Sequence, residues 1–404
     1  MIYLDHAATS RVREAALNAM LPYFSEQFGN PSSLHGPGLA AKKAMQEARA
    51  KIARLLGCET NEILFTSGGT ESDNTAITGY LLANPEKGKH IVTSSIEHPA
   101  VLRTCEFLKR FGYDLTVLSP DRNGIVSPEK VRGAIRSDTA LVSIQYANNE
   151  IGVIEPIEEI AETVLERGIA FHTDAVQAIG QIPIDLGKLP VTMLSASGHK
   201  FGGPKGIGFL YVKSGTKIEP LLHGGPQEKR MRAGTENVAG IVGMAEVLEG
   251  ALAQDYQKVA ELRDYMQNRI IREIPDVRVN GVPETCGTRE AGGTRETCGT
   301  RETYGTRGSD GTLFGRLPGS LSLSFGGVEA TSVLVFLDLA GIAASGGSAC
   351  SSAENKPSSV LQAIGVTEPY LSGTVRFTLS PENTREEADY TVQVLKETVA
   401  KLRR

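Results

Sequence analysis

Apolar and polar positions follow two different periods along the first part of the chain. Between about residues 40 and 250, short runs rich in β-branched and aromatic residues alternate with segments whose apolar residues recur at helical spacing. Such alternation favours an α/β fold with a largely parallel sheet covered by helices. The runs expected to form strands are EILFT (62–66), HIVTSS (90–95), TALVSIQYA (139–147), IAFHTD (169–174), TMLSAS (192–197) and GIGFLYV (206–212).

A different pattern begins near residue 240. A long helical pattern over residues 240–274 leads into a second region, which ends in the strand-like run GTVRFTLS and an amphipathic helix over residues 384–404. This order is typical of an α+β unit. We therefore expect an N-terminal segment at 1–14, a large α/β domain at 15–250 and a small C-terminal α+β domain at 251–404.

Residues 284–307 break the pattern. They read as four hexapeptides, ETCGTR, EAGGTR, ETCGTR and ETYGTR. A hexapeptide period can mark a β-helix, but these copies carry charges and have no recurring aliphatic position to bury. We predict a low-complexity, solvated insert in the small domain, in which Cys286 and Cys298 have no catalytic duty.

Composition narrows the class of protein. The chain has 404 residues, of which 40% are hydrophobic, so it can bury a sizeable core. A formal net charge of -5 gives no reason to expect binding to nucleic acid or to an anionic membrane. The start, MIYLDHAATS, does not resemble a signal peptide, and no apolar run reaches the length of a membrane span. A cytoplasmic location is the expectation.

The cysteines do not suggest a disulfide framework or a metal site. There are five, an odd number, and no two of them form a CxxC pair. Cys58 and Cys105 lie among apolar residues at helical spacing, where a small packed residue is the simpler interpretation. We predict reduced thiols and no bound metal.

Lys200 lies in the most informative run, SASGHKFGGPKGIGFLYV. Lysines normally belong to solvated faces, and taken alone this one is open to that interpretation. It follows a β-rich segment, however, and glycines surround it, so a ligand can approach the backbone closely. Partial desolvation would favour the neutral amine, which is a nucleophile toward an aldehyde. Pyridoxal phosphate is such an aldehyde.

Other segments offer groups that this cofactor needs. Asp174 ends an apolar strand in FHTDAVQA, where a carboxylate could hold the ring nitrogen protonated, although a helix N-cap is the plainer role. Gly68, Gly69 and Thr70 lie between a strand and a helix, so free N–H groups could face a phosphate; many such glycines only make the bend. His98 follows another strand and could stack on the ring, or could be an ordinary loop histidine.

Taken in order, these motifs resemble a known family. YLDHAATS, GNPSSLHGPG, SGGTESDN, SSIEHPAV, YANNEIG, HTDAVQA, SGHKFGGPKGIG, RAGTEN, SLSF, SGGSACSSA and RFTLS are spread over nearly the whole chain. They are similar to those of the pyridoxal-phosphate-dependent cysteine desulfurases of NifS/IscS type, within the class V aminotransferase group. The resemblance implies a fold-type-I α/β architecture, pyridoxal 5'-phosphate as cofactor, a homodimer and desulfuration of L-cysteine.

The resemblance also implies roles for individual residues. Lys200 would hold the cofactor covalently and act as base, Asp174 would bind its ring nitrogen, and His98 would stack on the ring and exchange protons. The remaining contacts are implied as follows: phosphate binding by Gly69, Thr70, Ser197, His199 and the partner subunit's Thr235; contact with the phenolic oxygen or ring edge by Asn149 and Gln177; and binding of the substrate carboxylate by Arg376 with Asn149.

Cys350 lies within AASGGSACSSAENKPSS, residues 343–359, where Gly, Ala and Ser offer little to pack. A structural cysteine wants apolar neighbours and a metal-binding one wants a second ligand, and neither is present. The resemblance implies that Cys350 is the nucleophile that takes the substrate's sulfur as a persulfide. A weakly packed segment suits a thiol that must then reach an external acceptor.

The implied partners are L-cysteine and protein sulfur acceptors, such as an iron–sulfur scaffold or a tRNA or cofactor thiolation enzyme, whose clusters Cys350 could contact. The one departure from the family pattern is the insert at 284–307. Two alternatives stay open: a selenocysteine lyase or another pyridoxal-phosphate lyase or aminotransferase, and a non-catalytic sulfur-carrier scaffold.

Overall fold

A seven-stranded sheet is the centre of the larger part of the molecule in the computed structural model, which describes residues 1–282, 306–307, 313–347 and 357–404. Every residue of the inner parallel strands β3, β5, β6 and β7 is buried, as expected for parallel strands covered on both faces. Within this sheet, β8 alone runs in the direction opposite to the other strands. The mainly parallel sheet expected from the sequence is confirmed. Its order is β2 (Ile63–Thr66), β8 (Gly208–Val212), β7 (Met193–Ser197), β6 (Ala170–Asp174), β5 (Thr139–Ser143), β3 (His90–Ser94) and β4 (Asp114–Leu118).

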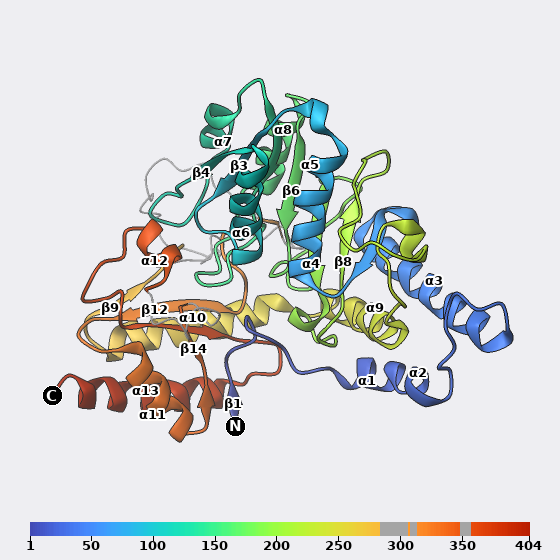
Figure 1. Cartoon of the computed structure of the whole chain (residues 1–404). Coiled ribbons are helices and arrows are strands. Elements are labelled where there is room, and N and C mark those ends of the chain that lie inside the picture. The colour runs from blue at the N-terminus through green and yellow to red at the C-terminus, as the bar shows by residue number, and fades with distance from the viewer. Residues whose placement is uncertain (283–305, 308–312, 348–356) are drawn as a thin grey trace, which may run out of the picture.

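Helices cover both faces of this sheet, so the unit has three layers (Figure 1). Ile63 and Phe65 point to one face, while Leu64 between them points to the other, as strand geometry requires. The first face packs against α3 (Gly36–Leu56), α7 (Pro128–Ala134), α8 (Ile157–Leu165) and α9 (Val238–Leu252), and the second against the continuous run α4 (Gly69–Asn74), η2 (Thr75–Gly79) and α5 (Tyr80–Ala83), and against α6 (Pro99–Leu108).

A four-stranded antiparallel sheet forms the second unit, at the lower left of Figure 1. Its apolar side chains and those of three helices build a separate core. The N-terminus of the chain belongs to this unit, because β1 pairs with β13 and Leu4 lies in the same core. The elements are β14 (Ser345–Gly346), β15 (Thr374–Thr378), β12 (Ser320–Phe325) and β9 (Val277–Val279), with α10 (Tyr256–Glu273), α11 (Ala330–Leu339), α12 (Ser359–Ala363) and α13 (Arg385–Leu402), and the pair β1 (Ile2–Tyr3) and β13 (Ile342–Ala343).

The helical pattern over residues 240–274 is two helices rather than one. The chain leaves α9 at Leu252 and enters α10 at Tyr256. Asp255 caps α10, since its side chain accepts a hydrogen bond from the Lys258 N–H. The apolar periodicity of the sequence did not reveal the break between the two helices. At this break the chain passes from the large sheet to the small one.

The predicted insert lies outside the described residues except at its end. Thr306 and Arg307 form β10, which pairs antiparallel with β11 (Leu313–Phe314).

Two short helices, α1 (Glu14–Met20) and α2 (Pro22–Ser25), follow the N-terminal segment. Among the helices of the described ranges, none is both long and apolar enough to cross a membrane.

Candidate active site

Two neighbouring strands of the large sheet end at reactive side chains. Asp174 is the last residue of β6, and Lys200 ends the short turn Gly198–Lys200 that follows β7. Because β6 and β7 are parallel, their carboxyl ends meet at one edge of the sheet. This edge is where α/β folds bind their ligands.

The Lys200 amine points to the N-terminal segment of the chain. Its Nζ donates hydrogen bonds to the carbonyl oxygens of Ala7, at 2.5 Å, and Ala8, at 3.0 Å. The buried Gln177 side chain donates to the same Ala7 oxygen at 3.0 Å. The N-terminal segment therefore forms one wall of the site.

Ser10 binds this segment to the turn that carries Lys200. The Ser10 hydroxyl donates to the His199 carbonyl at 2.6 Å and accepts from the Gly202 N–H at 2.8 Å. Gly202 has a φ of +91°, and a Cβ there would also meet the Arg13 side chain at 2.7 Å. A glycine is required by both the backbone and the space.

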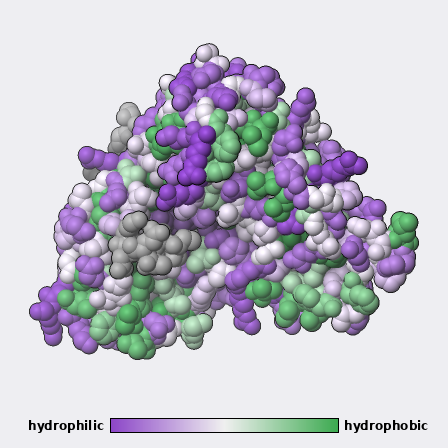
Figure 2. Space-filling view, viewed as in Figure 1, coloured by the Kyte–Doolittle hydropathy of each residue, from purple (hydrophilic) through white to green (hydrophobic). Residues whose placement is uncertain are grey.

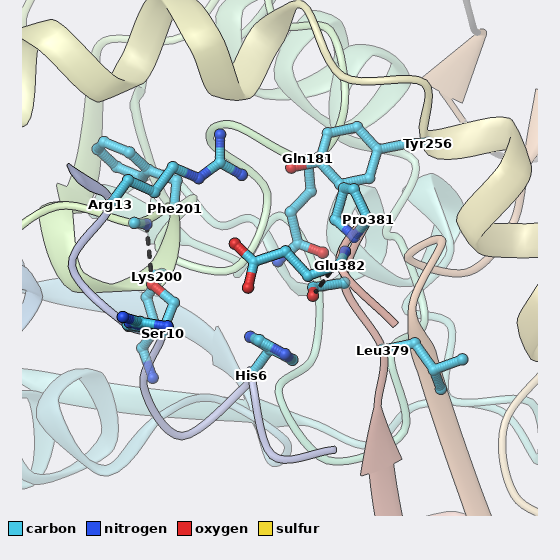
Figure 3. A pocket seen from close by; sticks show the side chains of 13 residues that line it. His6, Ser10, Arg13, Gln181, Lys200, Phe201, Tyr256, Leu379, Pro381 and Glu382 are labelled. Atoms are coloured by element: carbon cyan, nitrogen blue, oxygen red, sulfur yellow. Dashed lines mark hydrogen bonds between the residues drawn. The ribbon is translucent and has the colours of Figure 1, made fainter. Parts of the chain in front are cut away.

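A pocket opens where the two units meet (Figure 3). Figure 3 shows Arg13, His6 and Glu382 around it, from the N-terminal segment and the loop after β15. Burial lowers the pKa of His6, which favours the neutral imidazole. The lining also includes Lys200, Gly202, Gln181 and Tyr256, so the turn after β7 and the start of α10 face the same space.

Asp174 and His98 come together as the sequence suggested. Side-chain ligand atoms of Asp174, His98 and Asp73 all lie within 4.8 Å of one another. Burial raises the pKa of Asp174, while the charges of His98 and Lys200 and a hydrogen bond from the Val176 N–H, at 2.9 Å, lower it. His98 also caps α6, accepting from the Ala100 N–H at Nδ1.

The turn after β2 has the form of an anion cradle. Gly68 has a φ of +150°, and α4 begins at Gly69, so N–H groups of the first helical turn are without intrahelical acceptors. A Cβ on Gly69 would lie 2.6 Å from Val176 Cγ2, and one on Gly68 would lie 3.5 Å from Ser197 Oγ. Ser197 is therefore next to this turn, while Thr70 is exposed.

His199 lies in the turn after β7, next to Lys200. Its Nδ1 is 3.1 Å from the Thr9 hydroxyl oxygen. Burial, with the charges of Lys200 and Lys205, lowers the pKa of His199 to about 4, so it is neutral at pH 7. A neutral imidazole can donate one hydrogen bond to an anion without adding charge.

Arg376 reaches the site from the small sheet. It lies in β15, is 1% exposed, and donates to Asp5 Oδ1 at 2.8 Å and to the Asn149 carbonyl at 2.9 Å. Its Nε finds no acceptor within the described part of the chain. This side chain thus has a donor left for an anionic ligand.

Two residues that the sequence predicts for the site, Cys350 and Thr235, have no described contact with it. Cys350 lies among residues 348–356, outside the described residues, as do Cys286 and Cys298. Thr235 is exposed in the segment that precedes α9. The described residues nearest to Cys350 in sequence are Gly347 and Pro357. Their neighbour Ser358 donates to buried Glu150 at 2.5 Å.

Sequence reasoning missed Asp5, Ala7, Ala8 and Asp73. The carbonyls of Ala7 and Ala8 act through the backbone, which leaves no mark in residue type. Asp73 could have been noticed because it follows Gly69 by four residues and so lies on the same helical face. Asp5 gave no local signal, since its partner Arg376 is 371 residues away.

The fold is that of the α/β pyridoxal-phosphate-dependent enzymes. A solved NifS-like protein superimposes with a TM-score of 0.86 and 34% identity, covering 99% of each chain. A second, described as SspA in complex with cysteine, gives a TM-score of 0.78 and 35% identity over 95% of this chain and all of the other.

The chain belongs to the aminotransferase class-V family, whose model matches residues 2–290 and 309–391. It is 46% identical over 405 residues to the cysteine desulfurase IscS of Dictyoglomus turgidum, covering 100% of this chain and 95% of that one. It is 47% identical over 405 residues to the cysteine desulfurase IscS of Methanosarcina thermophila, covering 100% and 93%. The resemblance found in the sequence is confirmed.

Proposed function

We propose that the chain is a cysteine desulfurase that converts L-cysteine to L-alanine and transfers the sulfur to Cys350 as a persulfide. One observation carries the proposal: the large sheet brings Lys200, Asp174 and His98 to one edge, and the small sheet adds Arg376 from β15. The full-length likeness to enzymes named cysteine desulfurase supports this chemistry.

The donor set fits pyridoxal 5'-phosphate. Lys200 would attach the aldehyde, Asp174 would pair with the ring nitrogen and His98 would stack on the ring. Ser197 lies next to the turn at Gly68 and Gly69 that would receive the phosphate. Gly69, Thr70, Ser197 and His199 would hold the phosphate, together with the partner subunit's Thr235. When bound, this group supplies an electron sink for the electrons left when a proton leaves the substrate's α-carbon.

The residues of the chain then have separate duties. Arg376, held by Asp5 and the Asn149 carbonyl, would bind the substrate carboxylate through its remaining donor. The Lys200 amine would take the α-proton and return a proton to the product. His98 would exchange a second proton, while Gln177 and the Asn149 side chain would contact the cofactor's phenolic oxygen or ring edge.

The sulfur step belongs to Cys350. Its thiolate would form a bond to the substrate sulfur as the carbon–sulfur bond breaks, and the freed carbon would gain a proton to give L-alanine. The persulfide then serves a protein acceptor, for iron–sulfur cluster assembly or thiolation. A thiol used in this way requires a reducing compartment, which supports a cytoplasmic location.

The homodimer is supported by an apolar surface on the first part of the chain. Between residues 17 and 39 several large apolar side chains are exposed, and Figure 2 shows hydrophobic residues gathered over α1 and α2, at the lower right. A second copy would bury such a surface. The exposed residues are Leu17, Leu21, Phe24, Phe28, Leu34 and Leu39.

The test is direct. Purified protein is incubated with L-cysteine, and mass spectrometry locates any added sulfur while L-alanine is measured. The proposal expects one extra sulfur on the peptide that contains Cys350 and alanine in the solution. Alanine production without a persulfide, or turnover of selenocysteine alone, would contradict it and favour a lyase.

A further inference from the structure

Asp73 is a buried acid behind the candidate cofactor site. It lies in α4, is 0% exposed, and neither of its carboxyl oxygens accepts a hydrogen bond of normal geometry from the described residues. A buried polar group without a partner is costly, so it requires an explanation. One of its oxygens lies within 4.8 Å of Asp174 and His98 ligand atoms.

Apart from His98, whose ligand atom also lies within 4.8 Å of Asp174, the groups around Asp73 do not include a cation that could neutralise it. His172 Nε2 is 3.6 Å away, but burial lowers the pKa of His172 to about 3, and its two ring nitrogens contact the hydroxyls of Ser143 and Ser195. Burial also raises the pKa of Glu97 to about 8 and that of Cys105 to about 12. Both are neutral at pH 7, as is His172.

Two carboxylates this close in a buried site cannot both be ionised, because each charge repels the other. The surroundings distinguish them. Burial raises the pKa of Asp174, but His98, the Val176 N–H and Lys200 all oppose this and favour its ionised form. Burial and the charge of Asp174 raise the pKa of Asp73 well above its usual value, and the Ser195 hydroxyl offsets this only in part. The proton therefore belongs on Asp73.

We propose that Asp73 is a positioning residue that stays protonated and donates its proton in a hydrogen bond to Asp174, which keeps Asp174 anionic toward the cofactor's ring nitrogen. The Val176 N–H already occupies Asp174 Oδ1, so Asp73 would stabilise the same carboxylate as a second donor. Hydrogen bonds to the ionised form keep a carboxylate charged despite burial. This inference rests on the proposed cofactor site.

Two substitutions of Asp73 by residues of similar size distinguish a role as hydrogen-bond donor from a role that only fills space. Asp73→Asn keeps an N–H donor, whereas Asp73→Leu removes it. We expect the Asn variant to bind pyridoxal phosphate within about threefold of the parent, and the Leu variant to bind about tenfold more weakly, with the acid-side midpoint of binding shifted up by about one pH unit. If both variants bound pyridoxal phosphate equally well, Asp73 would only fill space and would not act as a donor. Tighter binding by the Asn variant, with the midpoint moved down, would show that Asp73 is ionised.

An infrared spectrum of the full chain without cofactor provides an independent readout. Part of the carboxylic-acid carbonyl absorption at pH 7.5 should be missing from Asp73→Asn, while the part that belongs to protonated Glu97 remains. This measurement stands even if the Leu variant does not fold. A spectrum unchanged in Asp73→Asn would overturn the inference. If the parent protein fails to bind pyridoxal phosphate while this absorption behaves as expected, the proposed function fails and the proton on Asp73 stands.

Discussion

In the proposed mechanism Cys350 carries the sulfur and Lys200 the cofactor. Lys200, Asp174 and the turn at Gly69 are positioned by strand ends and helix starts of the large sheet and by the N-terminal segment. Cys350→Ala should therefore fold and bind cofactor as the parent does. Persulfide and alanine formation should fall at least about a hundredfold, because no thiolate receives the sulfur.

The matched control is Cys58→Ala. Cys58 is a half-buried free thiol whose pKa burial raises to about 12, so it is a poor nucleophile. This variant should keep most of its activity. Alanine formation by Cys350→Ala at the parental rate would mean that another thiol, or direct elimination, releases the sulfur.

Lys200 is expected to be the attachment point of the cofactor. Borohydride reduction followed by peptide mapping should find the pyridoxyl group on Lys200, since its amine is the one held near Asp174. Lys205, on the exposed side of the same loop, is the internal comparison. A label on Lys205 would require a different site.

Glu97 should make stability depend on pH. Burial, with the charge of Asp174, raises its pKa to about 8 from an ordinary value of 4.5. Between these values the unfolded chain releases the proton and the folded chain keeps it, so the stability present at low pH is lost as pH rises to 8. The Glu97→Gln variant has no proton to release at this position, so it should not lose this stability as the pH rises.

Urea unfolding at pH 5 and at pH 8.5 measures the effect. Relative to the parent, Glu97→Gln should gain on the order of 4 kcal/mol between the two pH values. Its amide can still accept from the Ser94 hydroxyl and the Gln145 N–H, as Glu97 Oε1 does. An equal difference from the parent at both pH values would mean that Glu97 is ionised in the folded protein.

At the scale of elements, the N-terminal segment closes the site. Ser10 bonds His199 and Gly202 through one hydroxyl, and the neighbouring carbonyls hold Lys200. Ser10→Ala would leave the Gly202 N–H without this acceptor at a cost of about 1–2 kcal/mol. We expect lower thermal stability and weaker cofactor retention, measured by calorimetry and by absorbance after dialysis. Ser32→Ala, on the exposed surface, is the control.

The sequence could predict the elements that depend on local pattern. Inner strands such as β6 and β7 are short runs buried on both faces, and the residues at or just after their ends, Asp174 and Lys200, indicated the site. Local pattern could not show contacts between distant segments. The carbonyls that hold Lys200 and the pairing of Asp5 with Arg376 are set by tertiary packing, and so is the break between α9 and α10.

At the scale of the whole molecule, the large unit and the small unit have separate hydrophobic cores. Ile52 and Leu248 lie in a core of the large unit, and Val259 and Leu4 lie in that of the small unit. We propose that they correspond to a large domain at 15–250 and a small one at 251–404, joined by the segment 1–14. The insert at 284–307 lies between β9 and β11 of the small unit.

Removal of residues 284–305 tests whether the insert is needed. The cut keeps β10 and is expected to leave folding and cofactor binding nearly unchanged, because closure entropy changes by only about 0.6 kcal/mol per doubling of loop length. Circular dichroism and cofactor absorbance would report the outcome. Insoluble protein, or loss of cofactor, would show that the segment is packed structure.

The path of the first ten residues fixes when the site can form during synthesis. Ala7 and Asp5 are synthesised before their partners, because Ala7 binds Lys200, 193 residues later, and Asp5 binds Arg376, 371 residues later. The strand β1 likewise pairs with a distant segment, since Ile2 is the partner of Ile342. Contacts of such long sequence separation form late. A nascent chain that has completed the large sheet therefore still lacks the arginine of the site, which is completed only after β15 has been synthesised.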